Sequence, residues 1–240
     1  MSWNERAVAP KTLVDLFNYC NWIEYQEVGH DVDYAFIEGA NDTLYIYFEP
    51  SNSKTDWIVN FAFPRRPYKD MQIPYRVHGG FLGNWKAVED IVIARVTEKS
   101  ANGDYKWKRV VVVGYSHGGA LAALCHEGVW FHREDLREAG LAGISFDGPR
   151  VFGGLYVPAA LKERWAHFYV IRNHRDIVTH LPPVVIFFRH VGELVEIGAG
   201  EDPGLIDAHY PSKIRESLQE FEKSEDSAAI VADVFGRVLD

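Results

Sequence analysis

The stretch VVVVGYSHGGALAAL, residues 110–124, decides the fold. Residues 109–113 form an almost pure valine run, which is typical of a strand buried on both faces of a parallel sheet. The residues ALAALCH that follow are strong helix formers. Between the two lies Gly114-Tyr115-Ser116-His117-Gly118, which fits the pattern G-x-S-x-G of a serine on a sharp strand-to-helix turn. The stretch therefore predicts a nucleophile elbow with Ser116 at its apex.

The residue types of this turn suit nucleophilic chemistry. Gly114 and Gly118 leave room for the turn to close, so that the Ser116 hydroxyl projects above the sheet. It then lies at the N-terminus of a helix, whose dipole favours developing negative charge. The backbone amide of His117 is the first candidate donor to an oxyanion, whereas the His117 imidazole is expected to take no part in the chemistry.

A serine nucleophile needs a base and an acid, which in this fold class follow it in the order serine, acid, histidine. Asp176 comes directly after an apolar strand around 168–171, and the rival acid Asp147 follows a strand at 142–146. Loops at the carboxyl ends of strands are where the active sites of α/β proteins collect. His209 lies in the polar loop DPGLIDAHYP, before a helix. Position favours Asp176 over Asp147, and His209 over the other histidines.

Outward from the elbow, strands alternate with helices. Apolar spacing predicts helices at 10–27, 84–99, 158–165 and 213–222. In the first of them, Pro10 is expected to be a residue of the first turn. The inward face of the second is expected to carry Val88, Ile91, Val92 and Val96. Short β-branched and aromatic segments predict an antiparallel meander at 34–37, 43–48 and 57–63, and a late hairpin at 184–188 and 193–197. The pattern indicates one α/β domain over 1–240, with a mainly parallel central sheet flanked by helices and antiparallel strands on the N-terminal side.

Composition and charge exclude several classes of protein. The chain has 240 residues, of which 47% are hydrophobic, and a formal net charge of −9. That acidic balance argues against a nucleic-acid partner, which requires clustered Lys and Arg. The one compact basic group, Arg65, Arg66 and Lys69, is interpreted as a solvated loop, with a contact to a lipid headgroup or a substrate carboxylate as the alternative.

Compartment and cofactors follow from what the sequence lacks. It has no transmembrane segment of the length a bilayer requires, and residues 1–11 lack the apolar core of a signal peptide, so we expect a cytoplasmic protein. Export by phage lysis, or by another route without a signal peptide, stays open. Cys20 and Cys125 are expected to be small buried hydrophobes. Neither H-E-x-x-H nor C-x-x-C spacing occurs, so no metal or organic cofactor is expected, and the sequence does not indicate an oligomeric state.

Several motifs, taken together, resemble the class 3 (fungal-type) lipase family of the α/β-hydrolase superfamily. They occur in the family's order, as VHGGF at 77–81, GYSHGGALA at 114–122, GPRVFG at 148–153 and NHRDIVTHLPP at 173–183, followed by His209 with Tyr210 beside it. The resemblance implies an α/β-hydrolase fold with Ser116 as nucleophile, Asp176 as acid and His209 as base. It assigns Asp147 to a structural turn. It also favours a structural role for residues 78–80, although their sequence alone would fit the H-G-G-G oxyanion loop of other esterases.

The sequence departs from the family pattern at two places. Where the family has F-R-G-T, this chain has Phe61-Ala62-Phe63-Pro64, and proline carries no N–H at the donor position, so the amide of Ala62 or Phe63 must be the second oxyanion donor. The family's apolar lid helix is replaced by the polar segment 64–73, which favours soluble or short-chain esters over emulsified triglyceride.

The resulting hypothesis is a serine carboxylester hydrolase of the lipase or esterase type. It would form an acyl-enzyme on a small ester or lipid, with short to medium acyl chains. The alternatives are a phospholipase, a thioesterase or an acyltransferase with the same triad, and a catalytically weak protein that binds an acyl chain.

Overall fold

The computed structural model describes residues 9–28, 32–50, 64–68, 75–198 and 201–236. These residues contain a seven-stranded sheet. Its strands, in spatial order, are β1 (Gln26–Glu27), β2 (Asp33–Gly39), β3 (Thr43–Phe48), β6 (Arg109–Tyr115), β7 (Leu141–Phe146), β9 (Phe168–Asn173) and β11 (Glu193–Ile197). From β3 to β11 neighbouring strands are parallel, and β1 and β2 add an antiparallel edge. The predicted fold class is thereby confirmed.

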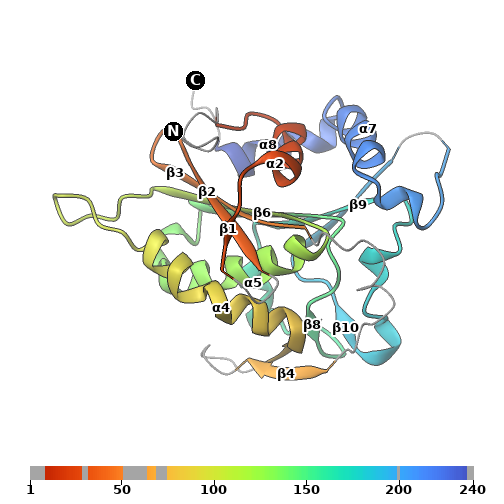
Figure 1. The fold of residues 1–240 in the computed structure, drawn as a ribbon, viewed down its shortest axis with the longest axis horizontal. Helices are drawn as coiled ribbons and strands as arrows, with labels where there is room; N and C mark the ends of the chain where they lie inside the picture. Colours follow the sequence, from red (N-terminus) through yellow and green to blue (C-terminus); the bar gives the residue numbers. More distant parts are fainter. Residues whose placement is uncertain (1–8, 29–31, 51–63, 69–74, 199–200, 237–240) are drawn as a thin grey trace.

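Helices cover both faces of this sheet (Figure 1). On one face lie α4 (Gly79–Val96) and α5 (His117–His132), and on the other lie α2 (Leu13–Trp22), α7 (Pro211–Phe221) and α8 (Glu225–Phe235). Shorter helical turns occur in the connections, namely η1 (Glu134–Leu136), α6 (Ala159–Lys162), η2 (Glu163–Trp165), η3 (Val178–His180), η4 (Val184–Ile186) and η5 (Asp207–His209). Among the described helices, none combines the length and hydropathy needed to cross a bilayer.

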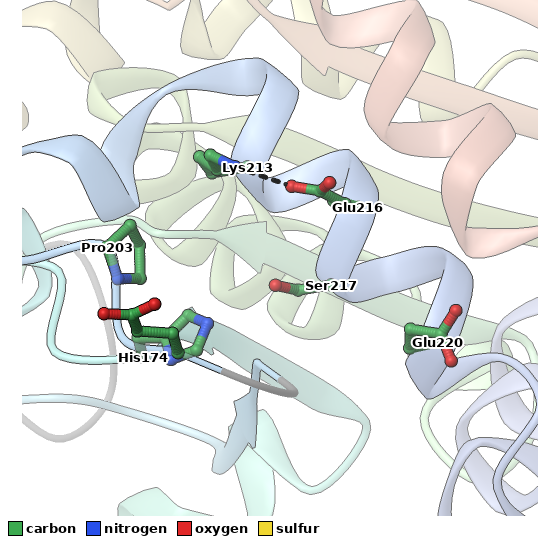
Figure 2. A pocket seen from close by; sticks show the side chains of 7 residues that line it. His174, Pro203, Lys213, Glu216, Ser217 and Glu220 are labelled. Carbon is green, nitrogen blue, oxygen red and sulfur yellow. Dashed lines mark hydrogen bonds and ion pairs between the residues drawn. The ribbon is translucent and has the colours of Figure 1, made fainter.

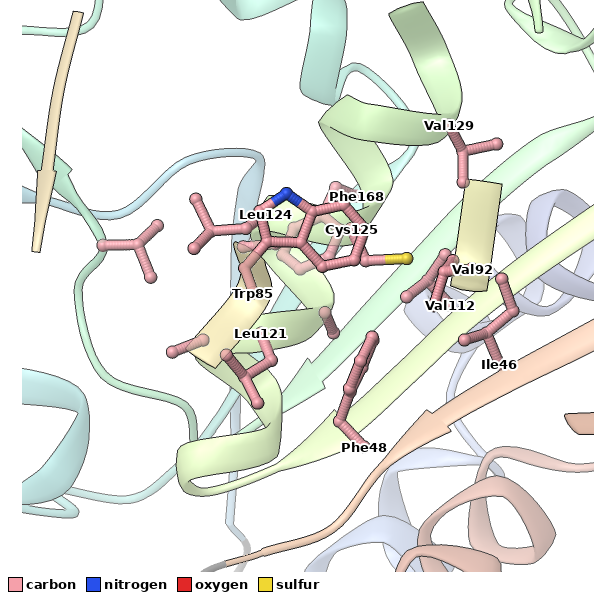
Figure 3. Close-up of a cluster of buried hydrophobic side chains, with 14 of the residues drawn as sticks. Ile46, Phe48, Trp85, Val92, Val112, Leu121, Leu124, Cys125, Val129 and Phe168 are labelled. Atoms are coloured by element: carbon pink, nitrogen blue, oxygen red, sulfur yellow. The ribbon is translucent and has the colours of Figure 1, made fainter. Parts of the chain in front are cut away.

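The valine run of β6 is explained by the two cores that sandwich it. Val110 and Val112 point into the core beneath α4 and α5, whereas Val111 and Val113 point into the core beneath α2 and α7. Figure 3 shows the first of these cores, where Trp85 and Cys125 lie among aliphatic and aromatic side chains. Because both faces of the strand are covered, alternation of polar and apolar residues is absent. Cys20 and Cys125 are both buried free thiols, as predicted.

A smaller antiparallel sheet lies beside the N-terminal end of α4, near the lower edge of Figure 1. Within the described residues its strands, in spatial order, are β10 (Phe188–Arg189), β8 (Phe152–Gly153), β5 (Tyr75–His78) and β4 (Arg65–Tyr68). The predicted hairpin of 184–188 with 193–197 is therefore wrong, because β10 pairs with β8 while β11 joins β9 in the main sheet. Arg65 and Arg66 are exposed, as expected, but on a strand rather than a loop. Lys69 lies outside the described residues.

The first two predicted helices differ most at their bounds from the helices observed. The first begins after Thr12, whose Oγ1 accepts a hydrogen bond from the Asp15 N–H at 2.9 Å, so Pro10 precedes the helix. The second begins at Gly79, and its buried stripe is Phe81, Trp85, Val88, Val92 and Val96. Ile91, predicted to point inward, is 40% exposed, because it lies beside that stripe rather than on it. α8 was not predicted, and the predicted strand 57–63 lies outside the described residues.

Candidate active site

The elbow is built as the motif predicts. Ser116 lies between β6 and α5 with φ 54° and ψ −122°, a backbone conformation that costs a non-glycine residue free energy. The turn closes because the residues two before and two after the serine carry no side chain. A Cβ on Gly114 would lie 2.0 Å from the Gly118 carbonyl oxygen, and a Cβ on Gly118 would lie 2.3 Å from the carbonyl oxygen of Phe48. Both glycines are therefore required by close backbone approach.

A continuous hydrogen-bonded chain connects Ser116, His209 and Asp176. The Ser116 Oγ lies 2.9 Å from His209 Nε2, and His209 Nδ1 lies 2.5 Å from Asp176 Oδ2. Since a carboxylate only accepts, the Nδ1 proton points to Asp176 and leaves Nε2 free to accept from the serine hydroxyl. The structure thus brings together the three residues that the sequence selected, and it gives the imidazole the tautomer of a general base.

Each partner of Ser116 is held by its own element. Asp176 is fully buried in the loop after β9, where its Oδ1 accepts the Val178 N–H at 2.8 Å. His209 ends the short helix η5, and its side chain is 17% exposed. The Tyr115 hydroxyl donates to the His209 carbonyl oxygen at 2.5 Å, and the two rings lie 5.1 Å apart. The base is therefore fixed on both its backbone and its ring.

Sequence reasoning did not assign a role to Tyr115 or to Arg150. Tyr115 occupies a variable position of the serine motif, so only its contact with His209 reveals its function. Arg150, in the G-P-R motif, is buried and donates to the carbonyl oxygens of His180 and Pro182, the latter at 3.1 Å. It thereby braces the loop that carries Asp176. The motif was the available signal for Arg150, although it did not indicate this contact.

Asp147, the rival acid, makes no hydrogen bond to a histidine among the described residues. It is buried directly after β7, and its Oδ1 accepts the Asn173 N–H at 2.7 Å. Burial, followed by the negative charge of Asp176, raises the pKa of Asp147 well above its usual range. The fold therefore assigns His209 to Asp176.

The oxyanion donors are only partly within the described residues. His117 is the first residue of α5, so its amide is one of the N-terminal groups without an intrahelical acceptor. Its imidazole lies 3.1 Å from the Asn84 side-chain amide, away from the hydrogen-bonded chain of Ser116. Ala62 and Phe63, expected to supply the second donor, lie outside the described residues. His78 caps α4 by accepting the Phe81 N–H at 3.3 Å, as its predicted structural role requires.

Asp147, Asp176 and His209 also have the residue types of a metal site, with ligand atoms within 4.8 Å of one another. Both nitrogens of His209 are already engaged, one by Asp176 and the other by Ser116. A metal on either nitrogen would displace one of these contacts. The arrangement fits proton transfer better than metal binding.

A pocket of about 80 Å³ lies apart from Ser116, between the loops around His174 and the helix α7 (Figure 2). It is lined by His174, Glu201, Pro203, Lys213, Glu216, Ser217 and Glu220. Since one water occupies about 30 Å³, this volume suits a few waters rather than an acyl chain. None of the three residues of the hydrogen-bonded chain lines it, so we do not assign it to substrate.

Residues 45–186, more than half of the chain, match the family described as lipase (class 3). The chain belongs to the class 3 lipase family. The lipase of Rhizomucor miehei is 31% identical over 154 residues, which are 64% of this chain and 41% of that lipase. The solved complex of the Rhizomucor miehei lipase with its propeptide is 26% identical, with a TM-score of 0.61 over 82% of this chain and 66% of that one.

A further similar solved structure is a triacylglycerol lipase whose catalytic centre is described as a serine protease triad. It is 28% identical and has a TM-score of 0.62, over 74% of this chain and 66% of that one. The chain spans about two fifths of the length of the curated lipases that it matches. The expected family and fold are confirmed.

Proposed function

We propose that this chain is a serine carboxylester hydrolase that cleaves lipid esters through an acyl-enzyme on Ser116. The observation that carries the proposal is the continuous hydrogen-bonded chain from Asp176 through His209 to the Ser116 hydroxyl. Membership of the class 3 lipases and the serine protease triad described for a related triacylglycerol lipase support it.

In the proposed reaction, His209 Nε2 takes the Ser116 proton while Oγ attacks the ester carbonyl carbon. The His117 amide donates to the oxyanion of the tetrahedral intermediate, at the positive end of α5. Asp176 stabilises the imidazolium that forms. His209 then protonates the leaving alkoxide, and a water, activated in the same way, releases the acid and regenerates the serine.

The acyl group is proposed to be of short to medium length. Leu205 and Ile206 lie just before His209, and both are largely exposed, which offers an apolar surface next to the base. The residues that take the place of the family's lid are polar, and Arg65–Tyr68 among them form the edge strand β4. A short apolar surface with a polar border suits a modest acyl chain better than an emulsion droplet.

The test is hydrolysis of p-nitrophenyl esters from acetate to palmitate by wild type, Ser116→Ala and the matched control Ser212→Ala, an exposed serine on α7. We expect hydrolysis that peaks at short to medium chains, is abolished in Ser116→Ala and is unchanged in Ser212→Ala. Equal rates for wild type and Ser116→Ala on every ester would overturn the proposal.

Two companion measurements separate the alternatives. Labelling of Ser116 by a fluorophosphonate probe, without ester turnover, would indicate an activated serine with another substrate, such as a phospholipid or a thioester. Formation of a new ester in the presence of an alcohol would indicate an acyltransferase. The absence of labelling would favour the acyl-binding protein.

A further inference from the structure

A second buried carboxyl group lies beside the proposed triad. Asp147 directly follows β7 and Asp176 lies in the loop after β9, and these strands are parallel neighbours, so both residues lie at the same edge of the sheet. Asp147 is 1% exposed and Asp176 is fully buried. Each offers an oxygen within 4.8 Å of the other and of a His209 ring nitrogen.

The hydrogen bonds of this pair are incomplete if both groups are ionised. Asp147 Oδ1 accepts the Asn173 N–H, but its buried Oδ2 has no hydrogen-bond partner among the described residues. Asp176 accepts the Val178 N–H on Oδ1 and the His209 ring N–H on Oδ2. Two ionised carboxylates can only accept, so no hydrogen bond could form between Asp147 and Asp176. Two buried carboxyl groups this close together cannot both stay ionised, because their negative charges repel each other.

The surrounding charges place the proton of the pair on Asp147. Burial and the charge of Asp176 both raise the pKa of Asp147, and they outweigh the Asn173 amide and the Arg172 guanidinium, which favour its ionised form. Tyr115, on the neighbouring strand, has a pKa raised by burial and by both carboxylates, so its hydroxyl stays neutral and adds no charge to the pair. Asp176 has the better partner for a negative charge, because it faces His209.

We propose that Asp147 is a positioning residue whose protonated Oδ2 donates a hydrogen bond to the Asp176 carboxylate and holds it against His209. The proton of Asp147 stays in place throughout the reaction, while the serine proton moves to His209 and on to the leaving group. This inference rests on the proposed function, because it assigns Asp147 a role in that same site.

A purely structural role for Asp147 makes a different prediction. Its φ of 45° is a left-handed conformation that glycine adopts freely and asparagine tolerates. Asp147→Asn and Asp147→Gly therefore both allow the turn. Asparagine keeps an acceptor for the Asn173 N–H and a donor toward Asp176, whereas glycine loses both. If the turn alone matters, the two variants are equally active.

The experiment compares kcat, KM and the pH profile of wild type, Asp147→Asn, Asp147→Gly and the control Asp207→Asn, an exposed carboxylate two residues before His209. We expect Asp147→Gly to lower kcat about 10- to 100-fold with KM unchanged, since it loses a hydrogen bond to a charged group. Asp147→Asn should stay close to wild type, and so should Asp207→Asn. Wild type should lose activity as the pH rises through the raised pKa of Asp147, and Asp147→Asn should not.

A readout independent of turnover separates this proposal from the proposed function. Carbon-13 NMR of the aspartate carboxyl carbons should show one protonated carboxyl at neutral pH, which disappears in Asp147→Asn. An ionised Asp147 at neutral pH, or equal kcat in Asp147→Gly and Asp147→Asn, would refute the positioning role. If wild type hydrolyses no ester faster than Ser116→Ala, the proposed function fails, while the NMR signal still shows whether the carboxyl pair shares its proton.

Discussion

At the scale of the residue, the elbow depends on glycines, at positions where a side chain would not fit. Gly118 has no room for a Cβ because the carbonyl oxygen of Phe48, at the end of the neighbouring strand, would lie 2.3 Å away. A Cβ and a carbonyl oxygen cannot stay this close, so α5 and β3, which are packed together, would have to move apart. Gly83, on the exposed side of α4, has nothing within 4 Å of its Cβ position. The two glycines therefore make opposite predictions for the same substitution.

We expect Gly118→Ala to lower the free energy of unfolding by about 1–3 kcal/mol through overpacking, and to reduce kcat because Ser116 moves. Gly83→Ala should instead raise stability by up to about 1 kcal/mol through helix propensity, with kcat unchanged. Urea denaturation and ester hydrolysis of both variants check this. A Gly118→Ala protein as stable and active as wild type would show that the elbow can accommodate a methyl group at this position, and would contradict the prediction.

At the scale of elements, a buried ion pair joins α5 to its surroundings. Glu127, fully buried on α5, accepts hydrogen bonds from Arg164 of η2 and from the Tyr75 hydroxyl of β5. Burial raises the pKa of Glu127 to about 7, despite the favourable charge of Arg164. A carboxyl group with a raised pKa in the folded state binds its proton more tightly there than in the unfolded chain. Its contribution to stability is therefore lost as the pH rises between the two pKa values.

This predicts a pH-dependent stability that Glu127→Gln removes. In wild type the free energy of unfolding should fall, through this group, between its ordinary pKa of 4.5 and about 7. Glutamine keeps the hydrogen-bonding shape without a titrating proton, so the variant should lack this component. Urea midpoints across that pH range, with the exposed Glu134→Gln as control, measure it. Parallel curves for wild type and Glu127→Gln would contradict the prediction.

At the scale of the whole molecule, one tryptophan connects the two sheets. The Trp85 ring, on α4, packs edge-on against Phe48 of β3 with centroids 6.3 Å apart. Its indole N–H donates to the Tyr68 hydroxyl of β4 at 2.9 Å. β3 belongs to the main sheet and β4 to the small one (Figure 1). This fully buried side chain, labelled with Phe48 in Figure 3, therefore couples the two sheets.

Trp85→Ala is therefore expected to cost about 3–5 kcal/mol of unfolding free energy, from the lost burial and the cavity. Trp22→Ala is the matched control, because Trp22 is 56% exposed at the end of α2, and it should change stability by less than about 1 kcal/mol. Thermal and urea unfolding of the two variants distinguish these outcomes. Similar losses in both would mean that Trp85 does not couple the sheets.

Much of the fold and of the candidate site followed from local pattern. The strand, turn and helix around Ser116 were predictable because burial on both faces, close backbone approach and helix propensity each select residue types within a few positions. Chain order and the rule that loops at the carboxyl ends of parallel strands meet favoured Asp176 and His209, and the resemblance to the class 3 lipases selected them. Ile91 was misplaced because adjacent apolar residues on a helix do not all face the core.

The sequence by itself therefore determined the elbow, the α/β class and the three residues of the candidate triad. Only the tertiary structure decided that β10 and β11 belong to different sheets, since strand pairing depends on partners far away along the chain. It also decided that Asp147 lies beside Asp176, and that Tyr115 and Arg150 support the site. These facts depend on distances between segments that the fold brings together, and residue type and spacing do not encode them.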